Sequence, residues 1–436
     1  MKPELTVTLP NKRRAEGRED GVEKIPIKGG VVSVSRALEV LLEHERDRNI
    51  PLVLKRDLAA SITHWLGAQD HRPPFVDAAS ARRWKAVLAK EFGTDLNGEL
   101  RIADHDVPFG RPRVAKFTFI DLFAGIGGFR LALQAVGGRS VFSSEWDEKA
   151  KETYFSNFGE VPYGDIRAFT ADTIPDRDLA RLIPNHDVLA AGFPCQPFSL
   201  AGVSARNSLG QDHGFSCEIQ GTLFFDLMRI AKVKRPRVLL LENVKNLRSH
   251  DAGRTFDKIR RTIEEDLGYS FNSAVLDSAS LVPQRRRRCY MVCFRDGSSF
   301  DFPDLSGEPL ALASALEVNV DDSYTLSDRM WQGHVNRTKR NRDRGVGFSA
   351  NTADLSRPSN TLVARYYKDG KECLVPQEGK NPRMLTPREC ANLQGFPKTF
   401  KVHPTRSHAY RQFGNSVAVP VIDRIARAIV GQLGCE

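Results

Sequence analysis

The sequence has no uninterrupted apolar run of about 18 residues, the length at which a stretch becomes a candidate membrane-spanning helix. Its opening residues, MKPELTVTLPNKRRAEGRED, are charged where a secretory signal would carry an apolar core. We therefore expect a cytoplasmic protein with no membrane partner. Internal repeats are absent, and low-complexity sequence is restricted to short basic runs.

Cysteine is scarce, because only seven residues are scattered through 436 positions, an odd number with no CxxC spacing. That pattern argues against a zinc site or a redox dithiol and favours reduced thiols. We expect at most a few of these thiols to do chemistry, and no bound metal. The seven are Cys195, Cys217, Cys289, Cys293, Cys373, Cys390 and Cys435.

The composition bounds the class of protein. A chain of 436 residues that is 41% hydrophobic and 27% charged can form two or three folded domains. The formal net charge of +10 and the pI near 9.3 suit a polyanionic partner, since cationic side chains that neutralise phosphates release counterions. The charge fits a merely basic enzyme equally well, so it indicates nucleic acid without deciding for it.

Residues 1–115 differ in texture from the rest. A basic opening is followed by VSRALEVLLEHERDR and ARRWKAVLAKEFG, whose apolar residues recur at helical spacing. We predict a helical, partly disordered N-terminal extension. The segment from 316 to 400 is polar and basic and is punctuated by glycine and proline, which marks it as a separate, smaller domain.

From Phe117 onward, short apolar runs alternate with helical patterns. FTFIDLFA, SVFSSEW, HDVLAAGF, PRVLLLENV and RCYMVCFR are expected strands, and GGFRLALQAV and DEKAKETYFSNF are expected helices. Such alternation predicts an α/β domain, a doubly wound and mostly parallel sheet with helices on both faces. We assign residues 116–315 to it, completed by residues 401–436, where NSVAVPVIDRIARAIVGQL predicts a long final helix.

The first strand leads into a glycine turn, residues 124–128 (AGIGG), where the backbone can approach a ligand closely. About 20 residues later, Glu145 ends the next strand, in the place of a carboxylate that holds a ribose. Trp146 beside it offers a flat face to an adenine. These features also fit a nicotinamide dehydrogenase, or a glycine turn that binds nothing.

Two further strands end in reactive groups. HDVLAAGF runs into PCQPFS, which puts Cys195 at the carboxyl end of a parallel strand, where ligands bind in open α/β sheets. This cysteine is a candidate nucleophile, although a buried structural thiol is equally common. PRVLLL ends in Glu242, which delivers a carboxyl group to the same edge.

A basic run, LVPQRRRRCYMVCF, leads into another apolar strand. Gln284, Arg286 and Arg288 occupy alternate positions, so on an extended chain they share one face. The alternative is a solvated basic surface. Because the alternation leads into an apolar strand, we favour three side chains that share one face of that strand over a solvated surface.

Nine segments resemble, in order, the motifs of the bacterial cytosine-5 DNA methyltransferase family, from Phe117 to the C-terminus. They are DLFAGIGGF, SSEW, GDI, GFPCQPFS, QGTLFFD, LENV, QRRRR, RMLTPRECANLQGFP and RQFGNSVAVP. The resemblance implies an S-adenosylmethionine-dependent methyltransferase fold in which residues 316–400 form a target-recognition domain. It also implies transfer of a methyl group from S-adenosylmethionine to carbon 5 of a cytosine flipped out of double-stranded DNA.

The resemblance also implies residue roles. Cys195 would add covalently to carbon 6 of cytosine while Glu242 binds ring nitrogen 3 and the exocyclic amine. Arg286 would steady the base and the thiolate, and Arg288 would support Glu242. The implied cofactor residues are Phe123, Gly125, Ile126 and Gly128 at the methionine end, Glu145 on the ribose, Trp146, Asp165 and Ile166 around adenine, and Pro194, Leu223, Asn415, Ser416 and Val417 completing the pocket.

Several segments are expected to contact DNA. Residues 196–220, including Gln196 and Ser199, form a polar stretch that we interpret as a lid over DNA. Arg340 and Arg342 belong to a basic stretch suited to phosphates or bases. SNTLVARYYKDGKE resembles recognition regions for palindromes with CC and GG half-sites (CCWGG, CCNGG or CCGG), where Arg365 would contact guanine and Lys368 a phosphate or a second guanine.

Two alternatives to this function stay open. A branch of the same family methylates tRNA, and the N-terminal segment could serve a DNA-binding regulator. The recognition region and its basic stretch favour DNA. We expect a monomer on DNA, acting in host DNA methylation or in a restriction-modification system with a companion restriction endonuclease.

Overall fold

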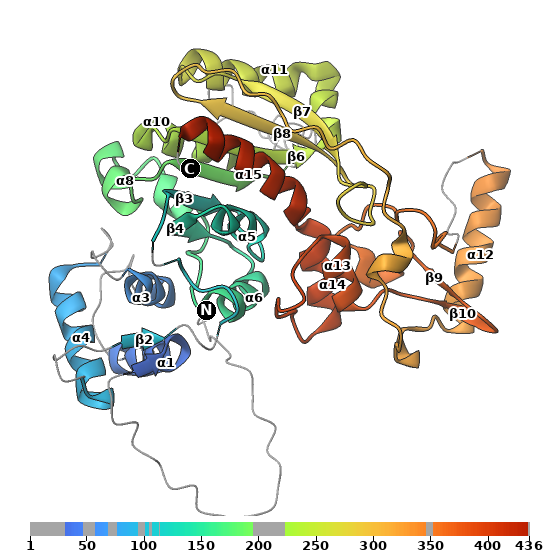
Figure 1. Cartoon of the computed structure of the whole chain (residues 1–436), viewed down its shortest axis with the longest axis horizontal. Helices are drawn as coiled ribbons and strands as arrows, with labels where there is room; N and C mark the ends of the chain where they lie inside the picture. Colours follow the sequence, from blue (N-terminus) through green and yellow to red (C-terminus); the bar gives the residue numbers. More distant parts are fainter. Residues whose placement is uncertain are drawn as a thin grey trace, which may run out of the picture.

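The computed structural model describes residues 31–46, 57–68, 76–94, 101–103, 107–112, 114–194, 223–345 and 352–434. Its centre is a six-stranded sheet in the order β4-β3-β5-β6-β8-β7 (Figure 1). The strands are β3 (Phe117–Leu122), β4 (Gly138–Ser144), β5 (Val188–Gly192), β6 (Val238–Val244), β7 (Asn272–Asp277) and β8 (Arg287–Phe294).

The sheet is mostly parallel. Strand β3 pairs in parallel with β4 and β5, and β5 pairs in parallel with β6. Strand β8 is antiparallel to both of its neighbours, β6 and β7. The predicted fold class, a mostly parallel α/β sheet of the methyltransferase type, is therefore confirmed.

Helices cover both faces of the sheet, so alternate residues of each strand enter different cores. Phe119, Ala190 and Leu240 face a core that includes α5 and α15, while Ile120 and Leu241 face a core that includes α10 and α11. The covering helices are α5 (Gly128–Ala135), α6 (Glu148–Phe158), α7 (Arg167–Thr170), α8 (Asp176–Leu182), α10 (Leu223–Lys234), α11 (Arg254–Arg261) and α15 (Val419–Leu433).

The N-terminal extension contains three helices, α1 (Val34–Glu45), α3 (Leu58–Gly67) and α4 (Ala78–Phe92). Strands β1 (Val31–Ser33) and β2 (Arg101–Ala103) form a short parallel pair beside them. Helix α1 lies within a stretch predicted from periodicity, and α4 begins three residues before the other predicted stretch, whereas α3 was not predicted. The three helices lie near the β4 edge of the sheet (Figure 1), and their buried residues join Ile120 and Leu122 in the core that includes α10 and α11.

The region from 316 to 415 includes one long exposed helix, α12 (Asp328–Asp343), which stands at the opposite end of the molecule from the N-terminal helices (Figure 1). The basic stretch is therefore helical. The short helix η5 (Leu312–Ala315) precedes this region, whose other elements are η6 (Asp322–Tyr324), η7 (Tyr366–Lys368), β9 (Val375–Gln377), β10 (Lys380–Arg383), α13 (Pro387–Leu393) and α14 (Arg406–Asn415). No helix in the described ranges is both long and apolar enough to cross a membrane.

Candidate active site and cofactor pocket

Four parallel strands deliver the predicted site residues to one edge of the sheet. Phe123 follows β3, Glu145 follows β4, Pro194 lies just after β5, and Glu242 lies near the end of β6. Ligands of open α/β sheets bind at the carboxyl ends of the strands. Cys195, Gln196, Ser199 and the rest of the expected lid lie outside the described residues.

The turn after β3 has an unusual backbone. Phe123, Gly125 and Gly127 have φ of 57°, 54° and 86°, in the left-handed region that side chains other than glycine rarely adopt. A Cβ at Gly125 would meet no atom within 4 Å, so this part of the turn faces open space. A Cβ at Gly128 would lie 2.7 Å from Val417 Cγ2, so a glycine is needed for the C-terminal segment to pack here.

Glu145 is held in place by backbone amides. Its Oε2 accepts a hydrogen bond from the Gly125 amide and its Oε1 one from the Asp147 amide, both at 2.8 Å. Burial raises the pKa of this carboxyl, and the amide hydrogen bonds oppose the rise. Each oxygen keeps a further acceptor site for a hydroxyl group. The turn and this carboxylate therefore fit a ribose-containing cofactor such as S-adenosylmethionine.

The expected adenine side is only partly assembled. Trp146 is 70% exposed and presents its ring to solvent, while Ile166 is buried. Asp165 accepts hydrogen bonds from the Arg167 side chain and amide, each at 3.0 Å to Oδ1. The remaining predicted lining residues lie around the same edge: Leu223 is half-buried at the start of α10, Asn415 is exposed at the end of α14, Ser416 follows it, and Val417 is buried.

The structure places Glu242 and Arg288 next to each other. Arg288 Nε lies 3.1 Å from Glu242 Oε1, because β8 runs antiparallel to β6 and its first residues meet the end of that strand. The Glu242 side chain is close to Gly192 at the end of β5, since its Oε2 lies 3.5 Å from the position of a Cβ there. Burial raises the pKa of Glu242, and Arg288 and Arg286 oppose the rise. The protonated carboxyl therefore persists to a higher pH than that of an exposed glutamate.

Arg286 has a different set of contacts from Arg288. Its guanidinium donates to the carbonyl oxygens of Leu362 (2.9 Å), Gly414 (3.1 Å) and Ser416 (2.6 Å). Burial and the neighbouring Arg288 lower its pKa to about 9, so it remains charged near pH 7. Arg286 thus connects the start of β8 to Leu362 and to the segment around Asn415–Val417.

Two polar side chains, Gln284 and Asn243, hold the backbone around the site, and neither had a role assigned from the sequence. The buried Gln284 side chain accepts from the Leu362 amide at 2.7 Å and donates to the Leu393 carbonyl at 2.9 Å. Asn243 Nδ2 donates to the Phe193 carbonyl at 2.9 Å and so holds the end of β5 that leads to Cys195. Both lie inside quoted motifs, QRRRR and LENV, which was the signal available in the sequence.

The predicted DNA-reading residues lie on exposed parts of the segment 316–400. Arg365 and Lys368 flank the buried Tyr366 in the η7 turn, and Arg340 and Arg342 are exposed on α12. The helix is joined to this turn through Asp369, which pairs with Arg337 at 3.1 Å. The Asp369 carbonyl also lies 3.0 Å from His334 Nε2. Contacts of Asp369 thus join helix α12, with Arg340 and Arg342, to the η7 turn. Arg365 and Lys368 lie in that turn.

The four cysteines in the described part of the chain are poor nucleophiles. Cys289, Cys293, Cys373 and Cys390 are all buried. Burial raises the pKa of Cys289 to about 11 and that of Cys373 to about 12. Because the thiolate is the reactive form, none of these four is suited to attack a substrate.

Comparison with known proteins identifies the family. Residues 117–431 match the family model for C-5 cytosine-specific DNA methylase. The type II methyltransferase M1.ScrFI of Lactococcus lactis subsp. cremoris is 44% identical over 80% of this chain and 87% of its own length. M.SsoII of Shigella sonnei is 43% identical over 81% and 90%, and the DNA-cytosine methyltransferase of Escherichia coli K12 is 39% identical over 84% and 86%.

Solved structures agree with the fold. The Dnmt2 methyltransferase of S. pombe superposes with a TM-score of 0.55 at 18% identity, covering 73% of this chain and 99% of that one. The methyltransferase EhMeth of Entamoeba histolytica gives 0.56 at 19% identity over 74% and 99%. At these identities the likeness establishes the fold alone.

The mostly parallel α/β sheet and the family match define the class, an enzyme that uses S-adenosylmethionine, and the glycine turn with the Glu145 carboxylate fits that cofactor. The chain belongs to the C-5 cytosine-specific DNA methylase family, and it is a DNA cytosine-5 methyltransferase. The nicotinamide dehydrogenase alternative is thereby excluded.

Proposed function

We propose that Cys195, Glu242, Arg286 and Arg288 carry the methylation of cytosine. The observation that carries this assignment is the buried Glu242–Arg288 pair beside Gly192, at the strand end that continues into Cys195. The burial of the other four described cysteines adds support, because it leaves their thiols unreactive.

The chemistry explains why a thiol and a carboxyl are needed together. Carbon 5 of cytosine is a weak nucleophile, and addition of the Cys195 thiolate to carbon 6 makes the ring electron-rich. A protonated Glu242 can donate to ring nitrogen 3 while its other oxygen accepts from the exocyclic amine, stabilising the charge that develops there. S-adenosylmethionine supplies an electrophilic methyl group on its sulfonium. Loss of the carbon 5 proton and breakage of the sulfur–carbon 6 bond then restore the ring and the free thiol.

Arg288 would keep the Glu242 carboxyl oriented toward the base. Arg286, with its guanidinium committed to three carbonyls, is better suited to position the surrounding chain than to touch the thiolate. Its Nε is the exception, a buried donor without a hydrogen-bond partner in the described part of the chain. That donor is the one part of Arg286 left to steady the base.

We propose that the cofactor lies between the glycine turn and the C-terminal segment. Glu145 would accept from the two ribose hydroxyls and Trp146 would stack on adenine, with Asp165 and Ile166 at its edge. The methionine end would lie against Phe123, Gly125, Ile126 and Gly128, and Pro194, Leu223, Asn415, Ser416 and Val417 would close the pocket. Asp165 must then share its carboxylate between Arg167 and adenine.

For the substrate, we propose a short palindrome with CC and GG half-sites. Arg365 would contact guanine, Lys368 a phosphate or second guanine, and Arg340 and Arg342 the DNA backbone. Their exposure on one assembly supports this. Gln196 and Ser199 would contact DNA around the flipped base, whose unstacking costs a few kcal/mol that such contacts offset.

The domain division that follows has a catalytic domain of residues 116–315 and 401–436 and a target-recognition domain of residues 316–400. We propose that the enzyme acts as a monomer on DNA in the cytoplasm, paired with a companion restriction endonuclease. A single active site suffices for each strand of a palindrome.

A trapping experiment tests the catalytic assignment. A duplex that carries 5-fluorocytosine at the target position cannot lose a proton from carbon 5, so the sulfur–carbon bond should persist in the presence of S-adenosylmethionine. We expect a denaturation-resistant complex with the wild type, none with Cys195→Ser, and roughly 100-fold slower formation with Glu242→Gln, a typical effect of losing a positioned acid. A covalent complex with Cys195→Ser would overturn the assignment.

A further inference from the structure

Helix α3 of the N-terminal extension buries an unusual number of polar groups. Asp57 at its start and Ser61, Thr63 and His64 within it are all buried against the catalytic domain. Burying polar groups is unfavourable unless each finds a hydrogen-bond partner. A helix that served only to cover the catalytic domain would present apolar residues here, so the partners of these groups define what the helix does.

Thr63 and His64 bond in part to carbonyls of their own helix, and the buried polar groups also have partners outside the helix in one short stretch, residues 160–164. The Gly164 amide donates to Asp57 Oδ1 at 3.0 Å, and the Val161 amide donates to Thr63 Oγ1 at 2.9 Å. The Tyr163 hydroxyl lies 3.4 Å from Ser61 Oγ. The ring of Tyr163 also packs on the imidazole of His64, with centroids 4.8 Å apart. Helix α3 therefore holds both the backbone and a side chain of the 160–164 segment.

Asp57 is the clearest of these contacts. An aspartate at the N-cap of a helix normally accepts from amides of its own first turn. The Asp57 side chain makes no such capping bond and instead accepts from Gly164. The carboxylate is thus used to fix the neighbouring segment instead of its own helix.

The other side of the 160–164 segment forms backbone hydrogen bonds with the end of strand β4 and with Glu145, which follows it. The Tyr163 amide donates to the Ser143 carbonyl, and the Glu145 amide donates to the Tyr163 carbonyl, both at 2.8 Å. The segment then continues directly into Asp165 and Ile166. One stretch of five residues, clamped between β4 and α3, therefore sets the backbone of Glu145 on one side and leads to the adenine-edge residues on the other.

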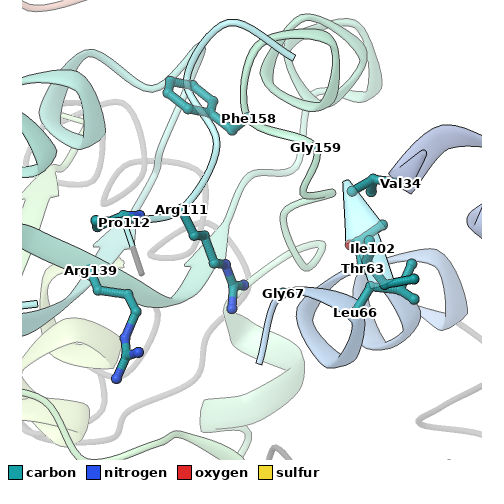
Figure 2. Close-up of a pocket in the computed structure, with 10 residues that line it drawn as sticks. All are labelled: Val34, Thr63, Leu66, Gly67, Ile102, Arg111, Pro112, Arg139, Phe158 and Gly159. Atoms are coloured by element: carbon teal, nitrogen blue, oxygen red, sulfur yellow. The ribbon is translucent and has the colours of Figure 1, made fainter. Parts of the chain in front are cut away.

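A buried cluster of charged residues around Glu160 connects the contact between α3 and the 160–164 segment to the glycine turn. Glu160, which is fully buried, contacts Arg111 and lies 2.9 Å from Arg130 Nη1, 3.1 Å from Ser143 Oγ and 3.1 Å from His64 Nε2. Arg130 belongs to α5, the helix that begins at the glycine turn. Arg111 extends between the catalytic domain and α3, beside a cavity of about 30 Å³ that has room for roughly one water molecule (Figure 2).

We propose that α3 is a positioning element of the cofactor site, with Asp57 and Thr63 acting through the 160–164 segment on Glu145 and Asp165. This rests on the cofactor roles proposed above for Glu145 and Asp165. The N-terminal extension then contributes to S-adenosylmethionine affinity without touching the cofactor. Its loss should raise the KM for S-adenosylmethionine and leave the KM for DNA and the kcat nearly unchanged.

The test compares matched variants of the full-length chain by titration calorimetry with S-adenosylhomocysteine. Asp57→Ala and Thr63→Val remove the two acceptors, and Asp57→Asn and Thr63→Ser keep them. Coupling between two sites is typically worth roughly 5- to 150-fold in affinity. We expect Asp57→Ala and Thr63→Val to raise the Kd by about that factor, and the two conservative variants to restore it to within about twofold of the wild type.

The control is Arg83→Ala, which breaks the 2.8 Å ion pair with Glu45 inside the extension, away from the 160–164 segment. It should lower the Tm and leave the Kd unchanged. An equal rise in Kd for Arg83→Ala, or no rise for Asp57→Ala and Thr63→Val, overturns the role of α3. Glu145→Ala separates this failure from that of the cofactor site, because an unchanged Kd in that variant overturns the site assignment itself.

Discussion

At the residue scale, Arg286 and Arg288 lie two positions apart and perform different tasks. Arg288 reaches across to Glu242, while Arg286 binds carbonyls of three residues that are distant in sequence. Because alternate residues of an extended chain share a face, their common side could be predicted. The partners of Arg286 could not, since Leu362 and Ser416 lie in irregular segments and Gly414 near the end of α14, and their return to this strand depends on the whole fold.

Arg365 carries the prediction about sequence choice. Its side chain is exposed beside the buried Tyr366, free to make the bidentate contact to guanine that is worth about 1–3 kcal/mol of discrimination. Arg365→Ala should therefore relax the preference for the cognate site by roughly 5- to 100-fold while S-adenosylhomocysteine affinity persists. Methylation of cognate and single-mismatch duplexes measures the ratio. Arg357→Ala, an exposed arginine of the same region that pairs with Asp354, is the matched control; an unchanged preference in Arg365→Ala would refute the contact.

Asp121 carries a prediction about pH and stability. Its carboxyl is fully buried, and neither oxygen makes a hydrogen bond of normal geometry to a described residue. Burial raises its pKa well above the usual value, opposed only in part by Arg130. The folded protein therefore holds a proton here that the unfolded chain releases above about pH 4, so wild-type stability falls as the pH rises.

Asp121→Asn removes that titration. The free energy of unfolding of the variant relative to the wild type should increase by about 1.4 kcal/mol per pH unit from pH 4 upward, until the raised pKa is passed. Urea denaturation between pH 5 and 8 measures it, with the exposed Asp172→Asn as control. A difference independent of pH would mean that Asp121 is ionised in the folded protein.

At the scale of elements, continuous apolar runs predicted strands correctly, whereas elements with polar residues on their buried face were missed. Strands β5 and β6 were predicted because each carries a continuous apolar run, VLAAG and VLLL, that is buried on both faces of the sheet. Helix α3 was missed because the face that it buries carries serine, threonine and histidine, which removes the apolar stripe. Edge strand β7 is only half-buried, so its sequence has no continuous apolar run.

Helix α12 was interpreted as a basic stretch and not as a helix, because its sequence has no apolar stripe: His334 is its one buried residue.

The cationic side chains of α12 are expected to neutralise phosphates. Arg340→Ala combined with Arg342→Ala should weaken DNA binding and reduce the slope of log K against log salt by up to about 1.8, with site preference unchanged. Fluorescence anisotropy at several salt concentrations measures the slope. The pair Arg177→Ala and Arg181→Ala on α8 removes two exposed arginines elsewhere; an equal loss there would contradict a specific role for α12.

At the scale of the molecule, the N-terminal helices and α12 stand at opposite ends, with the sheet edge between them (Figure 1). The basic composition indicated a polyanionic partner, and membership of the DNA methylase family agrees with it. The ordered motifs made the family and the catalytic fold predictable. The contacts of α3 with the 160–164 segment were not, since they join residues about 100 positions apart through side chains of ordinary type.

The central claim is that this protein methylates carbon 5 of cytosine in duplex DNA through Cys195. Its most direct test is incubation of the purified protein with tritiated S-adenosylmethionine and duplexes containing CCGG, CCAGG or CCCGG sites, alongside Cys195→Ser. We predict label on cytosine in at least one duplex and none with the variant. Label that persists with Cys195→Ser, or label on tRNA and on no duplex, would contradict the account.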